Sequence, residues 1–163
     1  MRYWWVNQNQ TYRQEQAGGY LWSPKRNSNG ARNPFYETMR EVSPGDVVFS
    51  FVDTRIAASP KPTEFGAAGA NWANISWKVR VTFTVLKNRV RPKDHIDVLR
   101  PLLPDRYAPL QANGDGLQGI YFTELTPVSF IKPSNMASTC ATRDAARLGK
   151  LSRELQSARE GAA

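Results

Sequence analysis

The chain has 163 residues, of which 40% are hydrophobic and 22% are charged, and its net charge is +8 at pH 7. This composition is typical of a folded soluble domain and excludes a disordered chain. The single cysteine, Cys140, and the single histidine, His95, exclude an internal disulfide and a Cys/His zinc site. We therefore expect no metal and no cofactor.

The excess of positive charge favours a polyanionic partner, because Lys and Arg side chains that neutralise phosphates release condensed counterions. Nucleic acid is the leading candidate, although a soluble protein can be basic without such a partner. No apolar run is long enough to cross a bilayer, and residues 1–10 hold no stretch typical of a signal peptide. We therefore expect a cytoplasmic protein with no membrane partner.

The first 52 residues predict two strands separated by loops and a short helix. Residues 2–8, RYWWVNQ, predict a strand that runs into an amide-rich loop. Gly18, Gly19 and the turn residues of 23–30 place Trp22 on a short extended piece inside a loop. The remaining signals predict a helix over 34–42, which Asn33 would cap, a turn at 43–46, and a strand at 47–52 that is buried on both faces.

The rest of the chain contains one clear strand and weaker signals. Residues 77–85 alternate apolar and polar side chains with a period of two, which predicts a half-buried antiparallel strand. A brief helical segment is expected around 96–103, a turn at 113–116, and a last strand at 117–125. Residues 128–140 are typical of a linker, and 141–160 predict an amphipathic tail helix.

These elements predict a compact α+β domain or a partly closed β-barrel with short flanking helices over residues 1–127. Residues 128–163 would form the linker and the tail helix, which could bind a protein partner or form a dimer. Trp4, Trp5 and Trp77 lie within strand signals, so we expect them mainly in the core. Trp22 and Trp72 lie in segments rich in Gly, Asn and Ser, where an aromatic side chain can line a pocket or cover the core.

The order of several motifs resembles the EVE branch of the PUA-like superfamily, which is related to YTH domains. These motifs are LWS at 21–23, GARN at 30–33, PGD at 44–46, VVFSF at 47–51, and NW at 71–72 before WKVRVTF at 77–83. The chain is most similar to the N-terminal module of bacterial modification-dependent HNH endonucleases. The resemblance covers residues 1–127.

This resemblance implies a pseudo-barrel that encloses a flipped, modified base, such as a methylated or hydroxymethylated cytosine or a methylated adenine, in an aromatic cage. By position, Trp22 and Trp72 match cage walls, Ser23 matches a residue that meets the base edge, and Asn7 matches an amide that reads it. Phosphate contacts are expected from the basic residues that flank these segments, namely Lys25, Arg26, Arg32, Arg89 and Arg91.

The chain departs from the family pattern in two places. Residues 56–58, IAA, run directly into SPKP, so a barrel strand is expected to be missing. In addition, an HNH motif needs more than one histidine, and no Glu-x-Lys nuclease motif is present, so we expect a binding module without nuclease activity. His95 beside Asp94 is interpreted as a helix-start residue, and Asp115 as a turn residue.

The sequence therefore favours a non-catalytic reader of a modified base in DNA. Two alternatives remain open at this point. A PUA-like reader of modified RNA or tRNA would use the same pocket chemistry, since stacking and amide readout do not require one sugar. A degenerate domain that acts as a protein-interaction module would follow if the missing strand left the pocket incomplete.

Overall fold

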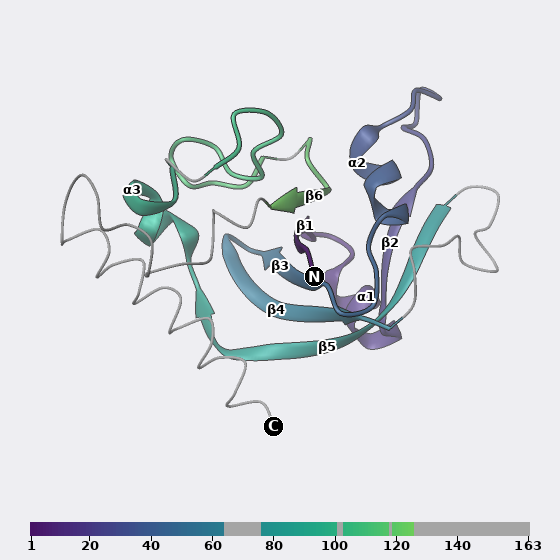
Figure 1. Cartoon of the computed structure of the whole chain (residues 1–163), viewed down its shortest axis with the longest axis horizontal. Helices are drawn as coiled ribbons and strands as arrows, with labels where there is room; N and C mark the ends of the chain where they lie inside the picture. Colours follow the sequence, from purple (N-terminus) through teal and green to yellow (C-terminus); the bar gives the residue numbers. More distant parts are fainter. Residues whose placement is uncertain (64–75, 101–102, 118, 126–163) are drawn as a thin grey trace.

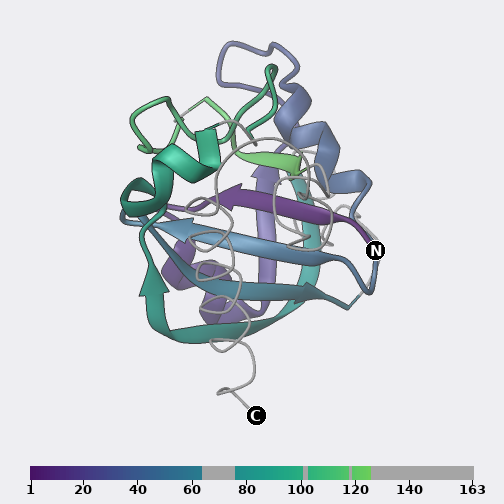
Figure 2. The same cartoon turned by 60° about the vertical axis from the view of Figure 1, so that its left-hand side comes forward.

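The computed structural model describes residues 1–63, 76–100, 103–117 and 119–125 (Figure 1). The predicted linker and tail helix lie outside these residues, as does Trp72. The described part is a mixed α+β fold in which one curled sheet forms a half-barrel and a few short helices flank it (Figures 1 and 2). The expected α+β class with a partly closed barrel is confirmed.

Six strands form the sheet in the order β2-β5-β4-β3-β1-β6. β1 pairs in parallel with β3, and the other neighbouring pairs are antiparallel. The long strand β5 bends around the sheet and pairs with β4 along one edge and with β2 along the other. The strands are β1 (Tyr3–Asn7), β2 (Tyr20–Pro24), β3 (Val47–Val52), β4 (Arg55–Pro62), β5 (Ser76–Val90) and β6 (Phe122–Leu125).

The helices are all short. They are α1 (Tyr12–Gly18), α2 (Pro34–Glu37) and α3 (Ile96–Leu99), with the 3-10 helices η1 (Thr38–Arg40) and η3 (Pro92–His95). The predicted cap of α2 is confirmed, because Oδ1 of Asn33 accepts a hydrogen bond of 3.0 Å from the backbone N–H of Phe35. Helix α1 was not predicted. Within the described residues, no helix has both the length and the apolar character that a membrane span needs.

Two predictions about strands are wrong. Trp22 is extended as predicted, but it lies in β2, which pairs with β5, rather than in a loop. The barrel strand expected to be missing is present, because β4 continues through Ser59 to Pro62 between β3 and β5. β4 pairs with β3 from Arg55 to Ala58 and with β5 as far as Pro62. Its two prolines thus lie beyond the stretch paired on both sides, where a missing N–H is tolerated.

The last predicted strand is shorter than expected, since β6 covers only Phe122–Leu125 of the predicted 117–125. The residues before it form turns instead, and one of these is closed by a 3.1 Å hydrogen bond from the N–H of Ile120 to the carbonyl of Leu117. This turn places Tyr121 at the end of the sheet rather than within it. The side chain of Tyr121 is therefore available to line a site.

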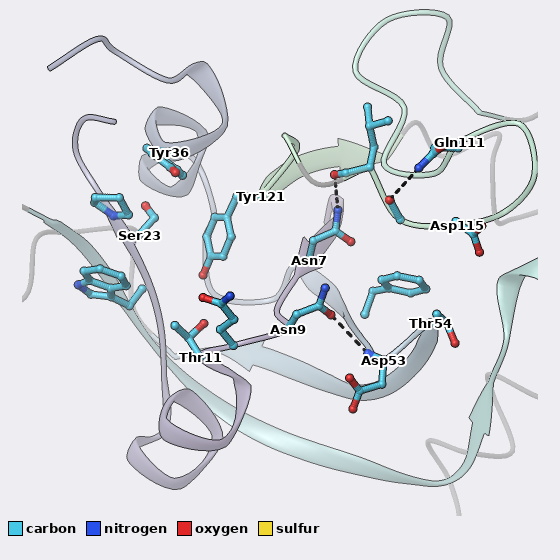
Figure 3. A pocket seen from close by; sticks show the side chains of 16 residues that line it. Asn7, Asn9, Thr11, Ser23, Tyr36, Asp53, Thr54, Gln111, Asp115 and Tyr121 are labelled. Atoms are coloured by element: carbon cyan, nitrogen blue, oxygen red, sulfur yellow. Dashed lines mark hydrogen bonds between the residues drawn. The ribbon is translucent and has the colours of Figure 1, made fainter. Parts of the chain in front are cut away.

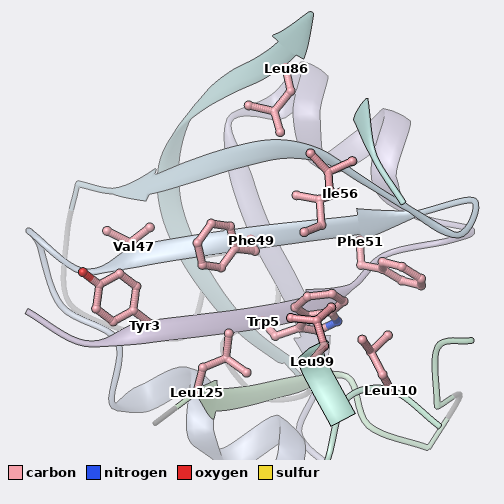
Figure 4. Close-up of a cluster of buried hydrophobic side chains, with 11 residues drawn as sticks. Tyr3, Trp5, Val47, Phe49, Phe51, Ile56, Leu86, Leu99, Leu110 and Leu125 are labelled. Atoms are coloured by element: carbon pink, nitrogen blue, oxygen red, sulfur yellow. The ribbon is translucent and has the colours of Figure 1, made fainter. Parts of the chain in front are cut away.

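Both faces of the central strands are covered by apolar side chains. All six residues of β3 are buried, as the sequence predicted. Trp4 and Trp5 are both fully buried, on opposite faces of β1. Trp4 stacks on Phe122 at 5.0 Å between ring centroids, and Trp5 packs at 5.1 Å from Phe51 in the second cluster, which Figure 4 shows. The predicted core role of these two tryptophans is confirmed.

The hairpin between β3 and β4 has a strained tip. Asp53 and Thr54 have φ values of 49° and 65°, and a two-residue hairpin turn of this kind normally holds Asn-Gly or Asp-Gly. A β-branched residue at positive φ is unfavourable. We expect Thr54→Gly to raise the free energy of unfolding by about 1 kcal/mol, measured by urea denaturation. Thr82→Gly, in the exposed middle of β5, is the control and should lower it. A loss of stability in Thr54→Gly would contradict the prediction.

Candidate functional site

A pocket of about 770 Å³ opens between β2, helix α2 and the 111–117 loop (Figure 3). Its volume lies within the range of small-molecule sites. Hydroxyl, amide and aromatic side chains predominate in its lining, with two carboxylates. The lining residues are Asn7, Asn9, Gln10, Thr11, Trp22, Ser23, Pro24, Tyr36, Phe51, Asp53, Thr54, Gln111, Asp115, Gly116, Leu117 and Tyr121.

Strand β2 contributes Trp22 and Ser23 to the lining of the pocket. Trp22 lies opposite Lys78 of β5 and Ser23 opposite Trp77, so antiparallel pairing fixes both positions. Ser23 is 1% exposed, and its Oγ forms no hydrogen bond within the described structure. A buried hydroxyl without a partner is costly. A ligand group that exchanges a hydrogen bond with Ser23 would remove that cost.

Two tyrosines form a second aromatic wall that the sequence analysis did not identify. Tyr36 projects from α2 and Tyr121 from the segment before β6, and their rings meet edge to face at 6.1 Å between centroids. In Figure 3 the ring of Tyr121 lies between Ser23 and Asn7. Phe51, from β3, also lines the pocket. The cavity thus has aromatic surfaces on β2, on α2 and at the sheet end, as stacking of a planar ligand requires.

The side chain of Asn7 faces the pocket, but its hydrogen bonds are made within the protein. Its Oδ1 accepts from Nε1 of Trp5 at 2.8 Å, and its Nδ2 donates to the carbonyls of Ile120 at 2.7 Å and Leu117 at 3.2 Å. Both amide protons are therefore occupied, and one oxygen lone pair as well. Asn7 holds the segment before Tyr121 against β1, so its main role is to build the pocket wall.

A buried carboxyl group, Glu15 of α1, lies directly behind the pocket wall. Its Oε2 accepts hydrogen bonds from the backbone N–H of Trp22 at 3.3 Å and from the hydroxyl of Tyr121 at 3.3 Å. Glu15 is 1% exposed. Burial raises the pKa of its carboxyl group to about 7, and hydrogen bonds from Thr11, Gln8, Trp22 and Tyr121 limit the rise.

Hydrogen bonds connect the Glu15 carboxyl group to strand β3 through Gln8. Nε2 of Gln8 donates to Oε2 of Glu15, and Oε1 of Gln8 accepts from the hydroxyl of Ser50 in β3. All three side chains are buried. Burial, and secondarily the Glu15 carboxylate, raise the pKa of the Tyr121 hydroxyl well above its ordinary value. Tyr121 is therefore protonated at neutral pH, and Glu15 is the titratable member of this chain of hydrogen bonds.

None of the five predicted phosphate-binding cations is among the residues that line the pocket. The backbones of Arg26 and Arg32 form an isolated antiparallel β-bridge within the loop after β2, and both residues are exposed. The Lys25 ammonium lies 4.5 Å from the ring centroid of Trp77. Arg89 is exposed in β5, and Arg91, which follows β5, lies 3.7 Å from Asp94.

The charged groups in the pocket lining itself are the carboxylates of Asp53 and Asp115. Asp115 is paired with Lys93 at 3.2 Å and accepts from Nδ2 of Asn113 at 2.9 Å, so it fixes the loop as well as occupying the turn that the sequence predicted. Within the described ranges, no three His, Cys, Asp or Glu side chains come together as a metal site. The pocket thus offers hydroxyl, amide and aromatic groups to a ligand.

The structure brings three of the four predicted base-binding residues, Asn7, Trp22 and Ser23, into one pocket, although they come from two strands. Trp72 lies outside the described residues. Trp77, expected in the core, packs partly buried against the cluster of Trp4. It also carries a second cation on its ring, because Cζ of Arg40 lies 5.2 Å from its centroid.

Comparisons with known proteins identify the fold without a function. No protein family model matches the chain, and no curated protein matches it. A crystal structure of a Pseudomonas putida protein is similar, with a TM-score of 0.51 and 12% identity over 78% of this chain and 93% of that one. Protein PSPTO5229 of Pseudomonas syringae gives a TM-score of 0.49 with 10% identity over the same shares.

A third similar structure is protein Rpa0253 from Rhodopseudomonas palustris, solved by NMR. It gives a TM-score of 0.38 with 15% identity, over 55% of this chain and 66% of that one. All three structures are structural genomics targets. At these identities the P. putida structure supports a shared fold alone.

Proposed function

We propose that this protein is a non-catalytic nucleic-acid-binding module that takes a flipped, modified base of DNA into the pocket beside β2. The observation that carries this proposal is the buried hydroxyl of Ser23, which has no partner in the described structure and lines a cavity with aromatic walls. A planar base could stack on the aromatic side chains while its edge satisfies that hydroxyl. The proposal also rests on the resemblance to EVE-type PUA-like domains.

The size and charge of the molecule are in keeping with such a ligand. A volume of about 770 Å³ is ample for a base with its methyl or hydroxymethyl substituent and part of its sugar. The net charge of +8 would attract the phosphate backbone, whereas the pocket lining carries carboxylates and no cation. Phosphate contacts would therefore lie outside the pocket, as base flipping requires.

The continuous strand β4 removes the main argument for a degenerate domain. That alternative depended on a missing strand between β3 and β5, and β4 occupies that place. RNA remains the other nucleic acid that the same pocket chemistry could serve. We therefore include RNA as an outcome of the test rather than as a second proposal.

Titration of duplexes with one modified base tests the function. We expect duplexes with 5-methylcytosine, 5-hydroxymethylcytosine or N6-methyladenine to bind differently from the unmodified duplex, and one of them to bind most tightly. Trp22→Ala should weaken that complex by about 1 to 3 kcal/mol, the contribution of one stacking face. Fluorescence anisotropy at two salt concentrations measures both effects, since charge contacts depend on salt and pocket contacts much less.

Trp77→Ala is the matched control. Trp77 is the neighbour of Ser23 on β5, but it does not line the pocket, so its removal should leave the preference for the modified base intact. Equal affinity for all duplexes, or an unchanged preference in Trp22→Ala, would overturn the proposal. Tighter binding of a matched modified RNA would transfer the function to RNA.

A further inference from the structure

The hydroxyl of Tyr121 can donate or accept a hydrogen bond, and the carboxyl group of Glu15 is its partner in the structure. Tyr121 lines the pocket, and its hydroxyl lies 3.3 Å from Oε2 of Glu15. Figure 3 shows this hydroxyl directed toward the segment that carries Thr11, which precedes α1. A tyrosine hydroxyl has one proton and two lone pairs, so the direction of its proton fixes what it offers to a ligand.

When Glu15 is ionised, it can only accept hydrogen bonds. The Tyr121 hydroxyl then donates its proton to the carboxylate and presents a lone pair to the pocket. The other groups that face Glu15 are donors as well, namely the amide of Gln8, the N–H of Trp22 and the hydroxyl of Thr11. Gln8, Trp22 and Tyr121 all donate to Oε2, whereas Oε1 has no hydrogen-bond partner within the described residues, so an ionised Glu15 keeps the tyrosine proton turned toward Oε2.

When Glu15 is protonated, it has one O–H that can donate a hydrogen bond, and a proton on Oε2 faces the groups that bond to that oxygen. Gln8 and Trp22 cannot accept the carboxylic proton, because the groups that they direct at Glu15 are N–H donors. The hydroxyls of Tyr121 and Thr11 can. A carboxylic proton given to Tyr121 turns the tyrosine proton toward the pocket, and the hydroxyl becomes a donor to the ligand.

We propose that Glu15 is a positioning residue that sets the hydrogen-bond polarity of Tyr121, so that the pocket accepts from an exocyclic amino group when Glu15 is ionised and donates to a carbonyl when Glu15 is protonated. The inference rests on the proposed function and names its ligand class. At and above neutral pH the pocket selects amino-bearing bases, cytosine or adenine derivatives, over their carbonyl-bearing counterparts. No charged side chain contributes to the Glu15 shift, and the facing titratable group, Tyr121, stays protonated.

5-Methylcytosine and thymine form the sharpest probe pair, because they have the same shape and differ only in an amino group or a carbonyl at C4 and in an accepting nitrogen or an N–H at N3. Each is placed opposite an abasic site, so that neither must be unpaired before it binds. With a Glu15 pKa of about 7, the carboxyl group is about nine-tenths ionised at pH 8 and about one-tenth at pH 6. Binding of 5-methylcytosine should therefore weaken about tenfold from pH 8 to pH 6, and binding of thymine should strengthen.

Two variants isolate the groups concerned. Glu15→Gln cannot ionise and carries an amide donor, so it should bind 5-methylcytosine as weakly at pH 8 as the unaltered protein does at pH 6. Tyr121→Phe removes the hydroxyl and should make both affinities independent of pH, even if Glu15→Gln folds poorly. Glu124→Gln, on the exposed side of β6, is the matched control and should keep the full pH dependence. Parallel pH profiles for the two bases, or pH dependence that persists in Tyr121→Phe, would overturn the inference.

NMR of the free protein separates this inference from the proposed function. The ¹³C resonance of the Glu15 carboxyl group should titrate near pH 7, and the ring resonances of Tyr121 should follow with the same midpoint. If they do, but no duplex binds at any pH, then Glu15 does control the Tyr121 hydroxyl and the base-reading function is wrong. We call this control of Tyr121 by Glu15 the relay. If Tyr121 does not follow Glu15, the relay is wrong whatever the protein binds.

Discussion

Replacing Trp5 with alanine is expected to lower the free energy of unfolding by about 3 to 5 kcal/mol. Trp5 is fully buried in β1 and packs against Phe51, which lines the pocket. Its Nε1 donates to Oδ1 of Asn7, so the substitution also leaves a partly buried amide oxygen without that donor. The loss is large compared with the 5 to 15 kcal/mol that stabilises a typical domain.

Urea denaturation followed by circular dichroism measures the change. Trp5→Phe keeps most of the apolar volume and loses the N–H, so it should cost less than the alanine variant and remain measurable if that variant does not fold. Trp22→Ala is the control for removing an indole, since Trp22 is only half-buried at the pocket wall and should cost clearly less than Trp5→Ala. Equal losses in Trp5→Ala and Trp22→Ala would contradict the assignment of one to the core and the other to the pocket.

The roles of the tryptophans could be predicted from the sequence to different degrees. Trp4 and Trp5 are adjacent on a strand and must face opposite sides, and the strand at 47–52 was predicted to be buried on both faces. Because β1 pairs with that strand, both of its own faces are covered as well. Trp22 lines a pocket, its role in stacking a base stays a prediction, and it lies in a paired strand rather than in a loop.

The errors at β2 and β4 have the same physical cause. Both strands contain residues with low strand propensity, Ser23 and Pro24 in β2 and Pro60 and Pro62 in β4. Local sequence favours turns at these places. Both strands pair with β5, a 15-residue strand whose alternating pattern was recognised, and that long-range pairing outweighs the local preference. A single sequence does not state which segments pair with the clear strand.

The inner part of the pocket was missed because its residues meet only in the folded chain. Glu15 and Tyr121 are 106 positions apart and touch through one hydrogen bond. Glu15 lies in α1, a helix of seven residues that was not predicted and whose N-cap residue, Thr11, makes no side-chain cap. Asn7 lines the pocket, but the carbonyls that occupy its amide belong to Leu117 and Ile120. The residues around Asn7 in the sequence do not indicate those partners.

The buried carboxyl group of Glu15 should also make the stability of the protein depend on pH. Its pKa is about 7 in the folded state, compared with 4.5 for the ordinary value that we take for the unfolded state. A raised folded-state pKa means that the native protein holds the proton more tightly than the unfolded chain. Glu15 therefore stabilises the fold fully below pH 4.5, and this contribution is lost as pH rises through 7.

Between pH 5 and pH 8 the loss from Glu15 amounts to roughly 2 to 3 kcal/mol. Glu15→Gln should lack this component, because an amide in the same place does not titrate. The free energy of unfolding of both proteins, measured in urea at pH 5 and pH 8, gives the difference directly, and other titrating groups cancel in the comparison. Glu124→Gln should follow the unaltered protein, because its side chain is exposed on β6.

If the stabilities of the unaltered protein and Glu15→Gln run parallel from pH 5 to pH 8, then the Glu15 carboxyl group is not titrating in the folded state. The relay through Tyr121 would fail with it, because that relay needs both protonation states of Glu15 within the accessible range. If the unaltered protein loses stability relative to Glu15→Gln between these pH values as expected, the fold carries a cost at neutral pH for keeping an ionised carboxylate behind the pocket. Such a cost is the expected mark of a group retained for its role in binding, since a fully apolar wall would be more stable.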